Sequence, residues 1–123
     1  MIKKNIVAGL GEIGLPISKI LSKNSITIGY DIDKKLMNKK SIKKYEENPT
    51  LFLHICIPFS KKFLTNVQKL IQKFEPEIVV IHSTISPNTT STLQSKLQIP
   101  VIYSATRGIH KRMIRDLRRY TKF

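Results

Sequence analysis

Three glycines near the start of the chain have the spacing of a phosphate-binding turn. The segment Gly9–Gly14 (GLGEIG) matches the pattern G-x-G-x-x-G and directly follows a short apolar run typical of a strand. In such a turn the first glycine permits a tight bend, the second lets backbone approach a pyrophosphate, and the third lets helix and strand pack closely. The amides at the start of the next helix would then face the phosphates. The pattern predicts a dinucleotide site made by Gly9, Gly11, Glu12, Ile13 and Gly14.

A carboxylate follows the first glycine at the spacing of about 20 residues that dinucleotide-binding turns require. Asp31 ends the second apolar run, where it can accept hydrogen bonds from both ribose hydroxyls of an adenosine and repel the extra phosphate of NADP. NAD is therefore the expected cofactor. Lys34 and Lys35 leave NADP open, because basic residues at this place can hold a 2′-phosphate. In a purely structural interpretation, the glycines only satisfy backbone geometry and Asp31 only caps a helix.

Apolar runs bounded by turn residues alternate with segments of helical period along the chain. This alternation predicts an α/β fold: a Rossmann-type, doubly wound parallel sheet of about five strands with helices on both faces. The runs are rich in Ile, Val and Leu without in/out alternation, as expected for strands covered on both faces. The strands are expected at Asn5–Ala8, Ser25–Tyr30, Leu51–Ile57, Glu77–His82 and Ile99–Tyr103.

The clearest helix is expected at Lys61–Phe74, because its apolar residues recur at helical spacing and Ser60 is placed to cap it. A first helix is expected at Glu12–Lys23, with Pro16 in its first turns, where a missing amide is tolerated best. The remaining helical segments are a thin, lysine-rich element over residues 33–45, a weak helix at Asn88–Leu97 and a basic amphipathic one at Gly108–Tyr120.

Length and composition favour one folded domain, residues 1–123. The chain is 41% hydrophobic and 24% charged, so it can bury a core and lacks the signature of intrinsic disorder. Its formal charge of +14 attracts nucleic acid, anionic lipid or phosphorylated ligands, although a genome biased toward Lys and Ile would produce the same excess on any fold. The single cysteine excludes an internal disulfide and any multi-cysteine metal site, so the expected compartment is the cytoplasm. No apolar run approaches the length of a membrane span, and no membrane association or targeting segment is expected.

Three blocks of the sequence share residues with a known family. They are Ile6–Pro16 (IVAGLGEIGLP), Ile55–Pro58 (ICIP) and Val80–Thr90 (VIHSTISPNTT). They are similar to an opening G-L-G-x-[IV]-G-L-P run, to a Cys-Val-Pro that ends a strand, and to a Glu-Ser-Thr-Val-x-Pro-Gly-Thr-Thr block. On these blocks the chain resembles the N-terminal NAD-binding domain of the UDP-glucose/GDP-mannose dehydrogenase family, the nucleotide-sugar dehydrogenases.

The resemblance implies NAD as the cofactor and a nucleotide-sugar as the substrate. It implies that Thr84 lies beside the nicotinamide and helps to position water or substrate, so Thr84 is the expected catalytic residue. The residues Ile57, Pro58, Ser83 and Thr84 are then expected to bind the cofactor together with the glycine turn and Asp31.

The chain also departs from the family pattern. A family Ser-Pro-Glu stretch is replaced by Ser104-Ala105-Thr106, which removes a carboxylate, although Arg107 stands where a family arginine follows. The family's catalytic cysteine belongs to a C-terminal part, whereas this sequence ends at Phe123. Cys56 matches the strand-end cysteine and is expected to be a small buried apolar residue. The expectation is a truncated cofactor domain, a fragment or homologue of an NAD-dependent dehydrogenase, inactive by itself.

A second hypothesis comes from a different class: a non-enzymatic, basic Rossmann-like module that binds nucleic acid or an acidic partner. Its cations would be the lysines of residues 34–44 and the basic residues of the C-terminal segment 107–122. The three histidines show no metal-ligand spacing; His54 is expected in the core and His82 near the cofactor cleft. The fifth strand would be an unprotected edge, so a homo-oligomer is also expected.

Overall fold

The structure, a computed structural model, describes residues 2–83 and 87–104. Along the chain the elements are β1 (Lys4–Ala8), α1 (Gly14–Leu21), β2 (Thr27–Tyr30), the short 3₁₀ helix η1 (Lys34–Leu36), α2 (Lys39–Lys44), β3 (Thr50–Ile55), α3 (Phe63–Phe74), β4 (Ile78–Ile81), α4 (Pro87–Lys96) and β5 (Val101–Tyr103). The five predicted strands are all present. The predicted terminal helix Gly108–Tyr120 lies outside the described residues.

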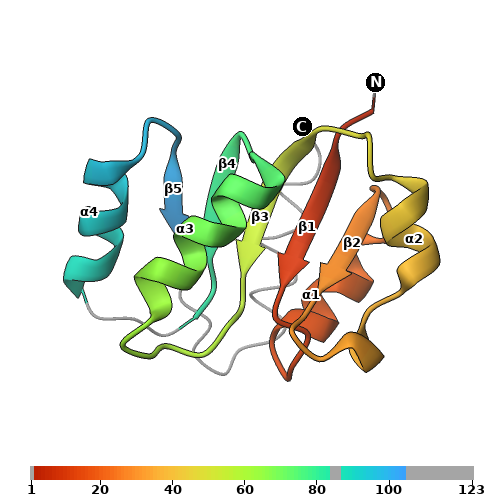
Figure 1. Ribbon diagram of the computed structural model, residues 1–123, viewed down its shortest axis with the longest axis horizontal. Helices are drawn as coiled ribbons and strands as arrows, with labels where there is room; N and C mark the ends of the chain where they lie inside the picture. The colour runs from red at the N-terminus through yellow and green to blue at the C-terminus, as the bar shows by residue number, and fades with distance from the viewer. Residues whose placement is uncertain (1, 84–86, 105–123) are drawn as a thin grey trace.

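The strands form one five-stranded sheet in the order β2-β1-β3-β4-β5, and every neighbouring pair is parallel. Figure 1 shows strands running in the same direction, so that their carboxyl ends lie at one edge of the sheet. From β1 the chain moves outward to β2 and then returns across β1 to β3, so the direction of winding reverses between β1 and β3. The predicted α/β, Rossmann-like parallel sheet is confirmed. In doubly wound sheets the ligand crevice lies where this reversal occurs, outside the carboxyl ends of the strands.

Two apolar layers cover the two faces of the sheet. Alternate residues of β1 point to opposite faces, so Ile6 and Ala8 join one layer and Val7 joins the other. The first layer receives Phe63 and Val67 of α3, and Ile42 of α2 packs at its margin. The second layer is made with α1. Figure 1 shows α2 and α3 across the near face of the sheet. Helices therefore lie on both faces, as predicted.

Helix α3 follows its predicted pattern but begins two residues later, at Phe63. Its N-cap is Lys62, which makes no side-chain cap, whereas Ser60 Oγ accepts a hydrogen bond from the Lys62 amide at 3.3 Å. The prediction that Ser60 caps the helix was therefore wrong by two positions: Ser60 closes the turn before the helix. The helix ends at Phe74, its C-cap Glu75 has a left-handed φ of 47°, and Pro76 prevents its continuation.

The lysine-rich segment is broken in two, where a single thin element was predicted. Asp33 accepts a hydrogen bond from the amide of Lys35 and starts η1, while Asn38 accepts from the amides of Lys40 and Ser41 and starts α2. Side chains of Asp and Asn compete with helical bonding and favour new helix starts, which accounts for the break. In the described ranges, no helix has the length and apolarity to cross a bilayer.

Strand β5 is an outer strand of the sheet, and α4 protects part of its backbone. The Gln94 side-chain amide accepts a hydrogen bond from the Val101 amide at 2.8 Å and donates one to the Ile99 carbonyl at 3.0 Å. Gln94 thus supplies bonds that a further strand would otherwise make. Self-association through this edge remains a prediction.

Candidate functional site

The glycine turn joins β1 to α1 at the carboxyl edge of the sheet, beside the end of β3. Gly9 has φ +95°, a conformation that favours glycine, and its amide donates to the Tyr30 carbonyl at 2.8 Å. A Cβ on Gly9 would lie 2.8 Å from the backbone carbon and oxygen of Cys56. The fold therefore requires glycine at this position.

Gly14, the first residue of α1, is even more crowded. A Cβ there would lie 1.6 Å from the Gly9 carbonyl oxygen and 3.2 Å from the Cys56 Cβ. This is the close crossing of helix and strand that the third glycine was predicted to allow. It brings the start of α1 against the turn itself.

Gly11 differs from Gly9 and Gly14, the other two glycines of the turn. A Cβ built on it meets no heavy atom within 4 Å, its φ is not left-handed, and the residue is exposed. Neither packing nor backbone geometry requires glycine at this position. The open side of the turn is the place where a pyrophosphate would approach the backbone, and a Cβ would stand in that space.

The start of α1 presents positive charge to the same space. Its N-cap is Ile13, which has no side-chain cap, and no acidic residue lies in the first helical turn. The Leu15 amide already donates to the Gly11 carbonyl at 3.1 Å. The first amides of a helix that lack such a partner carry a partial positive charge, which favours an anion. Pro16 is the third residue of α1, where its missing amide removes no helical hydrogen bond. Glu12 is exposed and Ile13 is half-buried.

Asp31 lies directly against the turn. Its Oδ2 accepts a hydrogen bond from the Leu10 amide at 2.7 Å, and its Oδ1 accepts one from the Asp33 amide at 2.8 Å. The Leu10 side chain packs over Gly29 of β2, which fixes the turn from a second side. Each carboxylate oxygen keeps a further lone pair, so the carboxylate can hold the turn and still accept ribose hydroxyls. Helix capping falls to Asp33 and not to Asp31.

The ends of β3 and β4 complete this edge. Strand β3 ends at Ile55, two residues before its predicted end, and the Cys56 amide still donates to the Ala8 carbonyl at 2.8 Å. Ser83 is buried, and its hydroxyl donates a short hydrogen bond to the Ile57 carbonyl. Ile57 is half-buried and Pro58 is exposed beside the turn. The structure thus brings Ile57, Pro58 and Ser83 to the edge that carries the glycine turn.

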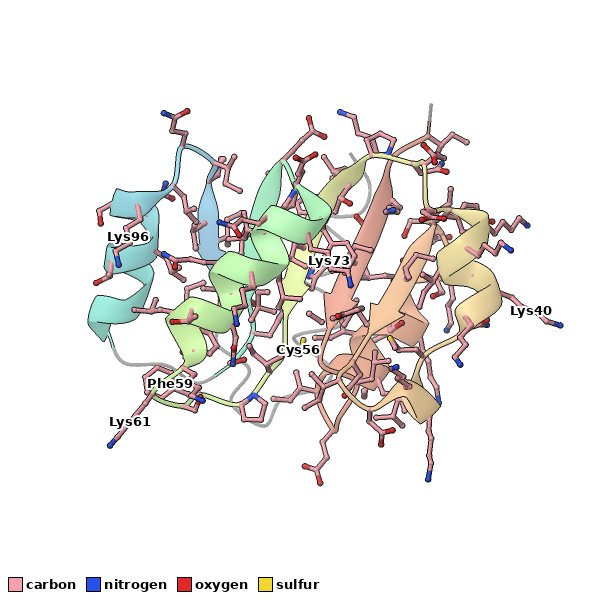
Figure 2. The ribbon with its side chains drawn as sticks, viewed as in Figure 1. Lys40, Cys56, Phe59, Lys61, Lys73 and Lys96 are labelled. Carbon is pink, nitrogen blue, oxygen red and sulfur yellow. The ribbon has the colours of Figure 1, made fainter. Side chains whose placement is uncertain are left out.

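The β3–α3 loop extends this edge outward. Phe59 is half exposed, and Figure 2 shows Phe59 and Lys61 at the carboxyl edge, with Lys61 directed away from the molecule. Thr84 and Arg107 lie outside the described residues, so the expected catalytic role of Thr84 stays a prediction.

Cys56 packs behind the turn, on the α1 side of the sheet. Burial raises the pKa of its thiol to about 12. At neutral pH the thiol is protonated, and the thiolate is the nucleophilic form of cysteine. Cys56 packs against the second apolar layer, but it is half-buried and not fully buried as predicted.

Two histidines that are distant in sequence meet beneath this edge. Nδ1 of His54 lies 2.8 Å from Nε2 of His82, with the rings stacked at a centroid distance of 5.1 Å. Their exposed fractions are 1% and 0%. Burial lowers the pKa of His54 to about 3, with His82 adding to the effect, and burial lowers the pKa of His82 to about 4. Both imidazoles are neutral at physiological pH, one donating a hydrogen bond and the other accepting it.

The sequence did not predict this pair. His54 was expected in the core, which is confirmed, but its partner was not foreseen because the pairing depends on the register of β3 and β4. Nε2 of His54 has no hydrogen-bond partner among the described residues. Within the same ranges, no group of three or more His, Cys, Asp or Glu side chains is placed to hold a metal ion.

Comparison of the chain with protein-family models, with curated proteins and with solved structures found no match. The candidate site is therefore defined by its own geometry: an open glycine turn, an uncapped helix start and a carboxylate that share one edge of a parallel sheet.

Proposed function

We propose that the chain binds NAD at the carboxyl edge of its sheet, with the pyrophosphate over the turn Gly9–Gly14. The observation that carries this proposal is the open space at Gly11. Gly9 and Gly14 are explained by packing, whereas Gly11 is a glycine that the fold does not need. Close approach of a ligand to the backbone is the physical reason for a glycine at such a position.

The charges around the turn support a dinucleotide over a simple phosphate. The start of α1 favours the pyrophosphate, and the Asp31 carboxylate beside Leu10 is placed to accept ribose hydroxyls. A carboxylate at this position repels a 2′-phosphate, so NAD should bind more tightly than NADP despite Lys34 and Lys35. The nicotinamide would extend toward Ser83, with Thr84 next in the chain.

Saturating NAD should stabilise the wild-type chain, and Gly11→Ala should remove much of that effect. At about 100 times its dissociation constant, a ligand adds about 2.7 kcal/mol, or roughly 10 °C in melting temperature for a domain of this size. A Cβ at residue 11 would intrude on the pyrophosphate and weaken binding at least about tenfold, which halves the stabilisation at the same NAD concentration. Thermal denaturation with and without NAD, NADH and NADP measures each effect.

The ligand-free Gly11→Ala variant is the internal control. Because nothing lies within 4 Å of the added methyl group, its melting temperature without NAD should stay within about 4 °C of that of the wild type. Absence of any NAD-dependent shift in the wild type would refute the proposal. Equal shifts in the wild type and the variant would place the dinucleotide somewhere other than this turn.

We further propose that this site is the cofactor half of a nucleotide-sugar dehydrogenase. The support is the sequence resemblance, together with the placement of Ile57, Pro58 and Ser83 along the same edge as the glycine turn. The family's oxidation passes through a thiohemiacetal on a cysteine. The only cysteine of the chain, Cys56, is a half-buried thiol that is protonated at neutral pH because burial raises its pKa to about 12, and it is unsuited to that role.

The chain alone should therefore bind cofactor without turning over substrate. Incubation with NAD and either UDP-glucose or GDP-mannose should produce no NADH absorbance at 340 nm. A preparation of the Gly11→Ala variant, purified in parallel, controls for contaminating host enzyme. Steady NADH formation by the wild type that is lost in Gly11→Ala would contradict this expectation.

A further inference from the structure

The segment after the candidate site carries a dense positive surface. From residue 34 to residue 44 the chain has six lysines and no acidic residue, and all six are exposed. This surface, called the lysine face below, consists of Lys34, Lys35, Lys39, Lys40, Lys43 and Lys44. Two of these residues belong to η1 and four to α2.

The four lysines of α2 share one side of the helix. At about 100° per residue, they span an arc of about 140°, whereas Ile42 and Tyr45 lie outside that arc. Ile42 and Tyr45 are half-buried and pack against the core on the α3 side of the sheet. Figure 2 shows Lys40 directed away from the sheet. The helix thus uses its apolar side for the fold and presents a side made of lysine.

This arrangement is unfavourable for the helix itself. Lys39 with Lys43, and Lys40 with Lys44, are like charges four residues apart, which destabilises a helix. Lys39 and Lys40 lie in the first turn, where cations oppose the helix dipole, whereas Lys43 and Lys44 lie in the last turn, where cations are favourable, so the net cost comes from the repulsion between the like charges. None of the six lysines forms an ion pair with any described residue. A bound polyanion would remove the repulsion that the fold leaves in place.

The lysine face is also held in a fixed position. Asn38 caps the start of α2, and the Lys4 ammonium of β1 donates to the carbonyls of Tyr45 and Glu46 at its end, at 2.9 and 3.3 Å. Lys4 is buried, so this contact ties the end of α2 to the sheet. The four lysines of α2 are therefore presented by an anchored helix and not by a loose loop.

We propose that the lysine face binds the phosphate backbone of double-stranded nucleic acid, independently of the dinucleotide site. Successive lysines on each row of α2 lie about 6 Å apart along the helix axis, which suits a dense row of phosphates. Binding to single strands relies on exposed aromatic side chains that stack on bases. Tyr45, the aromatic residue next to the lysines of α2, is half-buried and packs against the core. Binding to a membrane surface relies on apolar side chains that insert. Ile42, the only apolar residue of α2, packs against the core, whereas Leu36 of η1 is 48% exposed and the preceding Ile32 is 96% exposed. The choice of nucleic acid therefore rests on the paired rows of lysines on α2, and a membrane surface is the competing outcome of the test.

The test compares two variants that lose the same charge. The first, K39Q/K40Q/K43Q/K44Q, neutralises α2 and leaves Lys34 and Lys35, which adjoin the dinucleotide site. The control, K19Q/K23Q/K69Q/K96Q, removes four exposed lysines scattered over other parts of the surface. Binding to a labelled DNA duplex of about 20 base pairs is measured by fluorescence anisotropy between 50 and 200 mM KCl. A single strand of the same length and phosphatidylserine vesicles are measured in parallel.

The wild type should bind the duplex with a dissociation constant of about 1 to 100 micromolar near physiological salt, and more tightly at 50 mM KCl. The α2 variant should lose at least about 30-fold in affinity, and the slope of log affinity against log salt should fall by about 3. The control variant should lose only a few fold and keep its slope within about 1. Circular dichroism should show both variants folded, since Gln is a good helix former.

Equal losses in the two variants would overturn the proposal and reduce binding to a bulk-charge effect. Tighter, α2-dependent binding to vesicles or to the single strand would overturn it in favour of another partner. NAD-dependent stabilisation, measured on the same α2 variant, should match the wild type. If the chain did not bind NAD, the result for nucleic acid would still be valid, and if it did not bind nucleic acid, the result for NAD would still be valid. The two proposals can therefore be refuted separately.

Discussion

Lowering the pH from 7.5 to 5 should reduce the free energy of unfolding by about 4 kcal/mol. The loss comes from His54 and His82, which form a buried, neutral pair against Phe52 between β3 and β4. Unfolding exposes both imidazoles and returns each pKa to about 6.5, whereas the folded values are about 3 and 4. The unfolded chain therefore binds protons that the folded chain excludes.

The direction in which stability changes, and the pH range of that change, follow from the folded and unfolded pKa values of the two histidines. Stability is fully present above pH 6.5 and is lost as the pH falls toward the folded pKa values, at about 1.4 kcal/mol per unit for each group. Carboxylates titrate mainly below this window, so the change between pH 6.5 and 5 reports the histidines. Urea denaturation at pH 7.5, 6.5 and 5 measures it. A domain with a typical stability of about 5 to 15 kcal/mol would become marginal in mild acid.

A double variant, His54→Leu with His82→Leu, tests the assignment. Replacing both partners by apolar residues leaves no buried imidazole to protonate, and His110 remains as the third histidine of the chain. The stability of the double variant should change by less than about 1 kcal/mol between pH 7.5 and 5. A wild-type chain that is as stable at pH 5 as at pH 7.5 would contradict the neutral pair.

Much of the fold was predictable because burial on both faces of a parallel sheet imposes long apolar runs. The five strands and α3 were found in this way, with ends displaced by one or two residues. The break between η1 and α2 was missed, although Asp33 and Asn38 carry its local signal as helix caps. The strand order depends on pairing between distant segments, which no local pattern specifies.

The sequence predicted which residues make up the candidate site, but not the role of each one. The glycine spacing placed the turn, yet only the structure separates Gly9 and Gly14, which packing requires, from Gly11, which it does not. The hydrogen bond from the Leu10 amide to Asp31 and the His54–His82 pair have no sequence signal. Each depends on which strands are neighbours and on their register.

Gly14→Ala should destabilise the fold by at least about 3 kcal/mol, more than overpacking usually costs. The added methyl carbon would lie 1.6 Å from the Gly9 carbonyl oxygen, roughly half the closest distance that such atoms tolerate. The oxygen belongs to the backbone, and the position of a Cβ is fixed by the backbone that carries it, so no side-chain rotation relieves the contact. Relief requires α1 to move from the turn, which would also separate its Ile17 and Leu21 from Val7 in the second apolar layer.

Helix propensity and the entropy of the unfolded chain predict that Gly14→Ala stabilises the protein, which is the opposite of the effect expected from the clash. Alanine is favoured over glycine in a helix by about 1 kcal/mol, and it also restricts the unfolded chain. Gly11→Ala also restricts the unfolded chain, and its added methyl group meets no clash. Its free energy of unfolding should therefore stay within about 1 kcal/mol of the wild type. Urea denaturation of the two variants side by side separates packing from propensity. If Gly14→Ala proved as stable as Gly11→Ala, the close crossing of α1 and the turn would be wrong, and with it the geometry that holds the pyrophosphate.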